Sequence, residues 1–364
     1  MSLVSSIGTS GQTAGMRGAG PSFNGADCPN TEQILDCVHC GLCLSSCPTY
    51  LATSIEMSSP RGRLYMMRAV DEGRTGIGGV FVKHLDQCLG CLSCQTACPA
   101  GVPYGHLLEA ARAQIERKYD RPAADRTLRR LILWIFPYPD RLGPILGVLR
   151  WYQRLGFARL VRRSGVLAMV SPRLAHMEAL LPSIPSCAAR RPLPEVTPAR
   201  GRRVGRIGLL IGCVQRFLLP GINRATARAL AAAGYEVMTP PDQGCCGALH
   251  LHAGDLETGR ALAKKMIQTF ERTQVDTVVA NAAGCGSVMK EYGRLLRNET
   301  GWRDRAGAFS AKVRDVSEIL SEVRWDGTLK PVPLTVTYHE ACHLAHAQGI
   351  RSEPRSLLQQ VPGI

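Results

Sequence analysis

The sequence predicts a multidomain α+β protein, with a helical N-terminal domain followed by an α/β domain. Two observations predict this fold class. A four-cysteine run occurs twice with the same spacing before residue 100, and short apolar runs alternate with helical patterns after residue 205. A chain of 364 residues is long enough for two or three such domains.

Both cysteine runs have the spacing C-x2-C-x2-C-x3-C-P. Three thiols at three-residue intervals surround a cubane [4Fe–4S] cluster, and the fourth, placed before a proline, binds the other cluster. Structural zinc is the alternative, but each run already holds four cysteines and then recurs. We therefore expect two [4Fe–4S] clusters, the first bound by Cys37, Cys40, Cys43 and Cys98, and the second by Cys88, Cys91, Cys94 and Cys47.

Residues 26–118 are expected to form the cluster domain, preceded by a disordered leader at residues 1–25 that is rich in Ser and Gly. The long segment between Cys47 and Cys88 favours a helical ferredoxin-like domain over the smallest bacterial arrangement. One helix is predicted after Ser59, which would cap it, and another after Pro103.

Residues 119–205 form an Arg-rich helical connector in which Leu, Trp and Tyr alternate with arginine. One interpretation is a basic amphipathic surface for lipid headgroups or a partner. The other is a set of short helices that pack their apolar faces on the core. Pro137 and Pro139 break any long helix, and the apolar run Leu131–Phe136 is far too short to span a membrane.

Residues 206–364 are predicted to form an α/β domain with a parallel sheet. Its expected strands are Ile207–Ile211, Tyr235–Met238, Val275–Ala280 and Leu334–Tyr338, with helices at Pro220–Gly234 and Gly254–Thr273. Sites in such sheets form outside the carboxyl ends of the strands. Because each cysteine-bearing loop follows a predicted strand, we expect a second site, either a metal site or a redox-active thiol group, made of Cys213, Cys245, Cys246, Cys285 and Cys342.

Residues His339–His343 match the H-E-x-x-H pattern of zinc metalloproteases. That mechanism needs both histidines one turn apart on a helix, whereas this motif directly follows a predicted strand. We therefore reject the protease interpretation and expect His339 and His343 to lie near Cys342, as hydrogen-bond donors to it or as occasional ligands.

The formal net charge is +15, and eight thiolates with two oxidised cluster cores lower it to about +11. Such an excess fits a nucleic acid, an anionic membrane surface or an acidic protein. Only 5% of the residues are aromatic and no basic–aromatic ladder occurs, so we expect no nucleic acid partner. Cluster cysteines without a visible secretory signal indicate the reducing cytoplasm, with peripheral contact to the inner membrane as an option.

Six stretches resemble the iron–sulfur subunit of glycolate oxidase (glycolate dehydrogenase), within the wider family of cysteine-rich (CCG) domain oxidoreductase subunits related to heterodisulfide reductase. They are CVHCGLCLSSCPTY (37–50), SPRGRLYMM (59–67), QCLGCLSCQTACPAGVPYG (87–105), DQGCCGALHLHAG (242–254), NAAGCGS (281–287) and YHEACHLAHAQ (338–348). The resemblance implies that the eight cysteines of the paired runs are cluster ligands and that FAD and the substrate site lie on a partner subunit. It implies no catalytic residue in this chain.

The sequence departs from that family in two ways. The second C-C-G pair is missing before Ile364, which implies that the second half of the cysteine-rich domain is incomplete. Val288 stands where heterodisulfide reductases carry a further cysteine, so a full non-cubane iron–sulfur site is not expected. Cys28 and Cys187 match nothing in the family and are interpreted as free thiols.

The expected function is electron transfer in a flavin-dependent glycolate (2-hydroxy-acid) dehydrogenase, from a flavin subunit to a quinone or other acceptor. One alternative is a catalytic subunit that reduces disulfides or thiols, as in heterodisulfide reductases. Others are an iron–sulfur subunit of a lactate or glycerol-3-phosphate dehydrogenase, and a zinc-stabilised nucleic-acid binder. Iron and sulfide content separates the zinc protein from the others, and activity of the isolated subunit identifies a thiol reductase.

Overall fold

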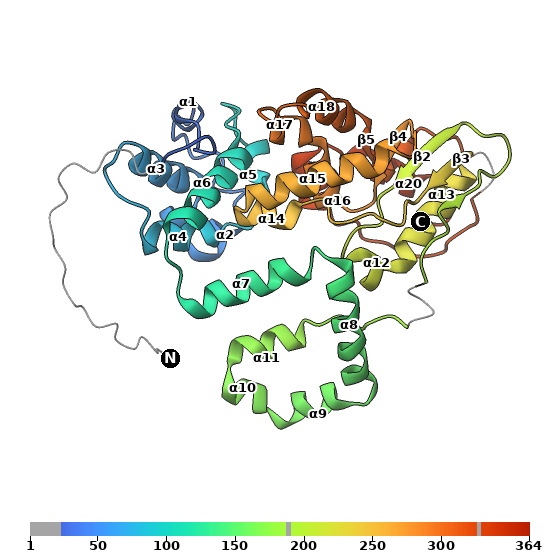
Figure 1. Cartoon of the computed structure of the whole chain (residues 1–364), viewed down its shortest axis with the longest axis horizontal. Helices are drawn as coiled ribbons and strands as arrows, with labels where there is room; N and C mark the ends of the chain where they lie inside the picture. Colours follow the sequence, from blue (N-terminus) through green and yellow to red (C-terminus); the bar gives the residue numbers. More distant parts are fainter. Residues whose placement is uncertain (1–22, 187–190, 326–328) are drawn as a thin grey trace. The chain divides into compact units, whose positions relative to one another are not determined.

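A computed structural model describes residues 23–186, 191–325 and 329–364 (Figure 1). The chain divides into two compact units. The first consists of the chain up to Leu89 together with Cys98–Tyr119, and the second of Gly90–Ala97 and Asp120–Ile364. Helix and sheet elements are both present, as the predicted α+β class requires.

The first unit is helical. Its elements are α1 (Thr31–Leu35), α2 (Pro48–Thr53), the 3-10 turn η1 (Glu56–Ser58), α3 (Pro60–Asp71), α4 (Gly79–Asp86) and α6 (Tyr104–Lys118). Helix α3 begins where the sequence predicts, because the Ser59 side chain accepts a hydrogen bond from the Gly62 N–H at 3.0 Å. Helix α6 begins directly after Pro103.

The core of the first unit lies between α3, α4 and α6. Met67 and Val70 of α3, Leu85 of α4 and Ala111 and Ile115 of α6 are completely buried there. This apolar stripe recurs every three or four residues, as expected of helices that bury one face.

Phe23 and Asn24, which were expected to belong to the disordered leader, contact the first unit. Residues 1–22 lie outside the described part of the chain. Phe23, however, is buried, and its ring centroid lies 6.3 Å from that of Phe81. The Asn24 N–H donates to the Gln114 side chain at 3.3 Å, so the packed chain begins before residue 26.

The second unit contains a five-stranded sheet of order β1-β3-β2-β4-β5. The strands are β1 (Val196–Thr197), β2 (Gly205–Leu209), β3 (Tyr235–Met238), β4 (Thr277–Ala280) and β5 (Val313–Asp315). All neighbouring strands are parallel except β1, which pairs antiparallel with β3 in the register Val196 to Met238. The sequence patterns did not indicate the edge strands β1 and β5, which are only two and three residues long.

Both faces of the sheet are covered by helices. Ile207, Leu209 and Val279 pack with α13 (Pro220–Ala232) and α19 (Val316–Ser321) on one face. Val278 and Ala280 pack with α15 (Leu256–Glu271) and α18 (Arg303–Lys312) on the other. The remaining elements of this half are α12 (Gln215–Leu218), α14 (Ala248–Ala253), α16 (Ala283–Lys290), α17 (Tyr292–Leu295), η2 (His343–Ala347) and α20 (Ser352–Gln359).

The predicted strand Leu334–Tyr338 is wrong. These residues form no ladder with the five strands, and Leu334 and Val336 are exposed. The alternation of apolar residues fits a half-buried strand, but a strand also needs a neighbour to pair with. The sheet ends at β5, and Pro331 and Pro333 lack the N–H that a ladder requires.

The connector forms a succession of helices in the second unit (Figure 1). They are α7 (Ala123–Ile135), α8 (Pro139–Arg154), α9 (Phe157–Ser164), α10 (Val166–Val170) and α11 (Pro172–Ala179). Among them α8 has a buried face, where Leu142 and Leu146 pack with Ile184. No helix in the described residues is long and apolar enough to cross a membrane.

Candidate iron–sulfur sites

The first predicted ligand set lies in the first unit. Cys37, Cys40 and Cys43 occupy the turns between α1 and α2, where Gly41 adopts a φ of 86°. Burial raises the pKa of Cys43, and the nearby thiols of Cys37 and Cys98 raise it further. Cys98, which belongs to the other run, is therefore near enough to Cys43 to affect its pKa.

Cys47 ends the first run and begins α2, with Pro48 as the first helical residue. Its side chain is buried, and its sulfur lies 3.2 Å from the Thr49 hydroxyl oxygen and 3.8 Å from the Ser58 carbonyl oxygen. The proline after the cysteine suits the first turn of a helix, so Cys47 lies at the N-terminus of α2.

The Arg63 side chain lies near Cys47 and is affected electrostatically by Cys88. The side chain is only 1% exposed, although arginine is seldom fully buried without a partner. Nε donates to the His84 carbonyl oxygen at 2.7 Å, Nη2 donates to the Thr49 hydroxyl at 3.0 Å, and Nη1 lies 4.0 Å from the Cys47 sulfur. Burial lowers the pKa of Arg63, but the nearby Tyr104, Cys88 and Cys47 outweigh it and the net shift is upward.

Cys88 has its own donors. The buried Tyr104 hydroxyl donates to the Cys88 sulfur at 3.5 Å, and Arg112 Nη2 donates to the Cys88 carbonyl oxygen at 2.6 Å. In the second unit, Cys94 is buried within α5 (Ser93–Thr96), and Cys91 lies two residues before that helix.

These surroundings fit an anionic iron–sulfur cluster. A [4Fe–4S] core with four thiolates carries net negative charge, and hydrogen bonds to its sulfurs tune its potential. A guanidinium and a phenolic hydroxyl already point at Cys47 and Cys88.

Sequence reasoning missed Arg63, Tyr104 and Arg112 as residues around the cysteines. Arg63 had one signal, because it falls on the apolar face of α3 four residues before Met67.

The second predicted site lies at the carboxyl edge of the sheet. Cys213 follows β2, Cys245 and Cys246 follow β3, and Cys285 lies in α16 after β4. Strand β2 is flanked by β3 and β4, so the chain reverses its direction of winding between β2 and β4. Ligands bind at such switch points in parallel sheets. Cys213 and Cys285 flank this one.

The four thiols form a hydrogen-bonded series from Cys213 through Cys245 and Cys246 to Cys285. The bond to Cys245, followed by burial, raises the pKa of Cys213 strongly. The hydrogen bond between Cys213 and Cys245 lowers the pKa of Cys245. The hydrogen bond between Cys245 and Cys246 and the burial of Cys245 outweigh this effect and raise the pKa of Cys245 to about 12. The bond from Cys245 likewise lowers the pKa of Cys246, while its bond to Cys285 and burial raise it well above the ordinary value.

These pKa shifts bear on the two chemistries expected at this site. A redox-active thiol pair needs a lowered pKa and access to solvent. Cys213, Cys245 and Cys246 are instead buried and held in the neutral form. Within the described residues, no group of three or more Cys, His, Asp or Glu side chains already has a metal-binding arrangement. A metal would therefore have to displace the thiol protons and draw the sulfurs together.

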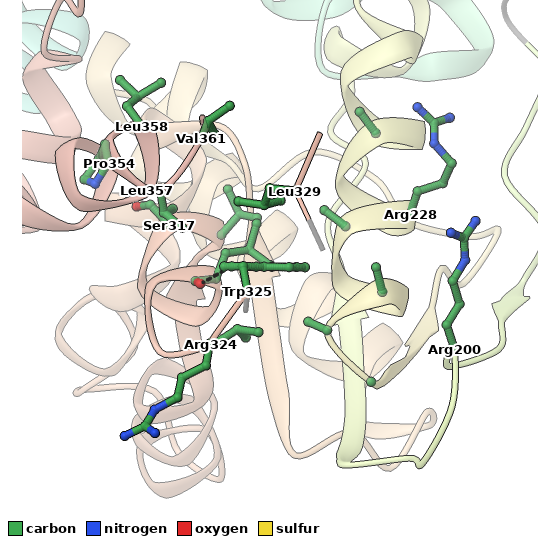
Figure 2. A pocket seen from close by; sticks show the side chains of 18 of the residues that line it. Arg200, Arg228, Ser317, Arg324, Trp325, Leu329, Pro354, Leu357, Leu358 and Val361 are labelled. Carbon is green, nitrogen blue, oxygen red and sulfur yellow. Dashed lines mark hydrogen bonds between the residues drawn. The ribbon is translucent and has the colours of Figure 1, made fainter. Parts of the chain in front are cut away.

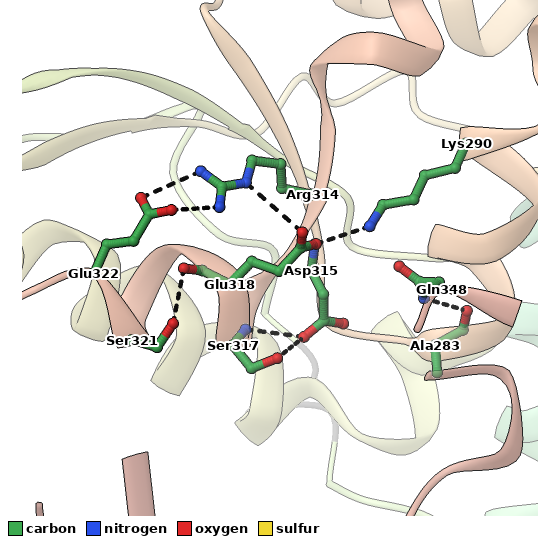
Figure 3. A network of polar contacts seen from close by, with 9 residues as sticks. All are labelled: Ala283, Lys290, Arg314, Asp315, Ser317, Glu318, Ser321, Glu322 and Gln348. Atoms are coloured by element: carbon green, nitrogen blue, oxygen red, sulfur yellow. Dashed lines mark hydrogen bonds and ion pairs between the residues drawn. The ribbon is translucent and has the colours of Figure 1, made fainter. Parts of the chain in front are cut away.

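A polar network fixes α16, the helix that carries Cys285 (Figure 3). Asp315 caps α19 by accepting from Ser317, while Glu318 accepts from the Asp315 N–H at 2.7 Å. Lys290, at the end of α16, forms an ion pair of 2.8 Å with Glu318. The network therefore ties α16 to β5 and α19.

Cys342 does not take part in the pKa interactions that connect the other four cysteines. It is exposed and follows the unpaired segment that was predicted as a strand. His339 is also exposed in that segment, whereas His343 begins η2, so the two histidines do not share a helix. The protease geometry is therefore not present.

His343 connects the turn at Gly90 with helix α16. Its Nε2 lies 3.1 Å from the Gly90 carbonyl oxygen, and its Nδ1 lies 3.0 Å from the Ser287 hydroxyl. Gly90 directly precedes Cys91, and Ser287 lies two residues after Cys285. Gln348 adds a second link, because its Nε2 donates to the Ala283 carbonyl oxygen at 3.0 Å.

Of the two cysteines interpreted as free thiols, Cys28 is free and half-buried, and burial raises its pKa. Cys187 lies outside the described residues.

A cavity of about 1100 Å³ lies away from all of these cysteines (Figure 2). Alanines of α13 and the apolar residues Leu357 and Val361 of the C-terminal segment line it. Trp325 also lines it, and its indole N–H donates to the Leu320 carbonyl oxygen at 3.2 Å. Arg200, Arg228 and Arg324 are at its rim. Its lining, as far as the described residues go, contains no cysteine.

Three family models match the chain. They are the 4Fe-4S dicluster domain over residues 33–102, the linker region of the glycolate oxidase iron–sulfur subunit over residues 124–181, and the cysteine-rich domain over residues 207–290. No solved structure matches. The fold and the cysteine sites thus define an iron–sulfur subunit of an oxidoreductase, built for electron transfer.

Relatives give the family. The chain is 38% identical to the probable glycolate oxidase iron–sulfur subunit of Bacillus subtilis, over 91% of this chain and 76% of that protein. It is 34% identical to the glycolate oxidase iron–sulfur subunit of Escherichia coli, over 88% and 74%. A fumarate reductase (CoM/CoB) subunit of Methanothermobacter marburgensis is 28% identical, over 93% and 57%. The chain belongs to the family of glycolate oxidase iron–sulfur subunits.

Proposed function

We propose that this chain is the electron-transfer subunit of a glycolate dehydrogenase complex. In this proposal a flavin subunit, which carries FAD, oxidises glycolate and delivers the electrons to this chain. The acceptor is a quinone or another carrier. The complex would lie in the cytoplasm, in peripheral contact with the cytoplasmic face of the inner membrane. The single observation that carries the proposal is the repeated four-cysteine run, in a chain whose relatives are named as glycolate oxidase subunits.

The chain would hold two [4Fe–4S] clusters, with the exchanged ligands given above. When bound, each cluster accepts and releases one electron at a time. The influence of Cys98 on the pKa of Cys43, and that of both Cys47 and Cys88 on Arg63, support the exchange of fourth ligands. Arg63 and Tyr104 would stabilise the thiolates of the second set, and burial around Met67 would keep water from them.

The thiol-reductase alternative has less support. Its reactive group would be the buried cysteines at the edge of the sheet, and their raised pKa values disfavour the thiolate that attacks a disulfide. We propose instead that Cys213, Cys245, Cys246 and Cys285 form a metal site, to which the exposed Cys342 does not contribute in this structure.

The test is reduction by substrate. The native complex is purified without oxygen, together with the subunits that accompany this chain, and glycolate is added while electron paramagnetic resonance is recorded. Glycolate is expected to produce the signal of reduced [4Fe–4S] clusters, whereas lactate and glycerol 3-phosphate are not. Reduction by lactate or glycerol 3-phosphate but not by glycolate would assign the chain to a different dehydrogenase. Disulfide reduction by the isolated chain would favour the thiol-reductase function.

A further inference from the structure

The helices α9 to α11 carry apolar side chains that point into solvent. Phe157 and Leu160 of α9 are 51% and 62% exposed, and Met169 and Val170 of α10 are 78% and 73% exposed. Leu180, directly after α11, is 82% exposed. Exposed apolar residues that occur singly need no explanation, but a succession of them over 24 residues marks an interaction surface. We call residues 157–180 the apolar arc.

The interpretation in which the connector helices bury their apolar faces on the core therefore does not describe α9 and α10. No residue of α7, α9 or α10 is buried. Helix α8 is the exception, and its buried face holds the connector on the second unit. The sequence pattern cannot tell these cases apart, because an apolar stripe is the same whether it packs on protein or on another apolar phase.

The charge around the apolar arc is strongly positive. Residues 124–181 contain ten arginines, no lysine and three acidic residues, a net charge of +7 out of +15 for the whole chain. Arg162 forms an ion pair with Glu178. Arg159 and Arg163 are exposed and have no acidic partner among the described residues. A planar guanidinium binds phosphate through two parallel hydrogen bonds, which the ammonium group of lysine cannot do.

The arc is held in place at both ends. Glu178 accepts from Arg162 at 2.8 Å and from the Tyr152 hydroxyl at 3.1 Å, which ties α11 to α9 and α8. Past α11, the Gln153 side chain donates to the Pro182 carbonyl oxygen at 2.9 Å. Figure 1 shows the three short helices running in an arc that leaves α8 and returns to it. The apolar side chains are therefore presented by a supported structure.

We propose that the apolar arc is a membrane-binding surface that lies in the headgroup region of an anionic bilayer. Phe157, Leu160, Met169 and Val170 enter the acyl-chain boundary, and Arg159 and Arg163 bind lipid phosphates. An in-plane arrangement agrees with the absence of a spanning helix among the described residues. The charge selects the partner, because anionic headgroups complement a surface rich in arginine.

The experiment measures binding of the anaerobically purified full chain to vesicles of phosphatidylglycerol and of phosphatidylcholine. We expect binding to phosphatidylglycerol that weakens at high salt, because added salt shortens the Debye length. Arg159→Gln/Arg163→Gln is expected to lower the partition coefficient roughly thirtyfold, since each arginine near an anionic surface contributes about 1 kcal/mol. Leu160→Ser/Met169→Ser is expected to lower it at least about tenfold.

Matched controls change the same residue types elsewhere. Arg191→Gln/Arg202→Gln and Val204→Ser/Leu334→Ser remove exposed side chains outside the arc and are expected to leave binding unchanged. Equal loss in the controls, or no binding of the parent chain to phosphatidylglycerol, would overturn the proposal. Binding of the arc to an acidic protein but not to vesicles would also overturn it. The visible absorption of the clusters checks folding of each variant and keeps this test separate from the test of electron transfer.

Discussion

Arg63 is the residue whose role depends most on the fold. Its buried guanidinium lies near two cysteines of the second predicted set and would place a fixed positive charge next to a cluster held there. Charge of this sign stabilises the reduced form and raises the reduction potential.

Arg63→Met is therefore expected to lower the potential of one cluster, by on the order of 50 mV, since 59 mV corresponds to a tenfold change for one electron. Potentiometric titration followed by electron paramagnetic resonance measures it. Arg63→Lys keeps the charge and should restore much of the potential. Arg68→Gln, on the exposed face of the same helix, is the control and should have no effect. If Arg63→Met, like Arg68→Gln, leaves the reduction potentials of both clusters at their values in the parent chain, Arg63 has a structural role only.

At the scale of single elements, the sequence predicts long regular segments well and short or unpaired ones poorly. Helix α3 and strand β3 lie where capping and apolar patterns place them. The helix predicted to begin at Gly254 is α15, which begins at Leu256 because Asp255 caps it by accepting from the Thr258 N–H. Strand β5 escapes detection, since three residues are too few to show a period.

For the candidate iron–sulfur sites too, local motifs are predicted well from the sequence, and contacts between distant segments are not. Spacing alone specifies the two cysteine runs, because each is a local motif. The grouping of Cys213, Cys245, Cys246 and Cys285 depends on three predicted strands in one parallel sheet, and the structure contains those strands. Cys342 was placed with them on the strength of a fourth strand that does not form. The roles of Arg63 and His343 arise from contacts between distant segments, which no sequence period reveals.

Asp315 allows a test at this scale. Its buried carboxylate accepts from the N–H and the hydroxyl of Ser317 at the start of α19. Asp315→Ala removes the cap and is expected to destabilise α19 by about 1 kcal/mol. Hydrogen exchange of the α19 amides should become about five to ten times faster. Asp304→Ala changes an exposed aspartate that caps no helix end, and should not alter that exchange. Equal exchange in the parent and in Asp315→Ala would show that the cap is dispensable.

At the scale of the whole molecule, the chain combines a cluster-binding unit, a cysteine-rich sheet domain and a connector of exposed basic helices. The first two carry the cysteines for which we propose cluster and metal sites, and the connector carries the exposed side chains for which we propose a membrane surface. This division explains how one chain could both carry electrons and bind at the surface where a lipid-soluble acceptor is found. The electron-transfer part of that account depends on the presence of iron.

The most direct test is therefore the iron and acid-labile sulfide content of the full chain purified without oxygen. Two [4Fe–4S] clusters predict about eight iron atoms and eight sulfides per chain, and iron in the sheet domain would add to this number. Zinc in place of iron, with no sulfide, would contradict the account, because the eight paired cysteines would then serve a structural site.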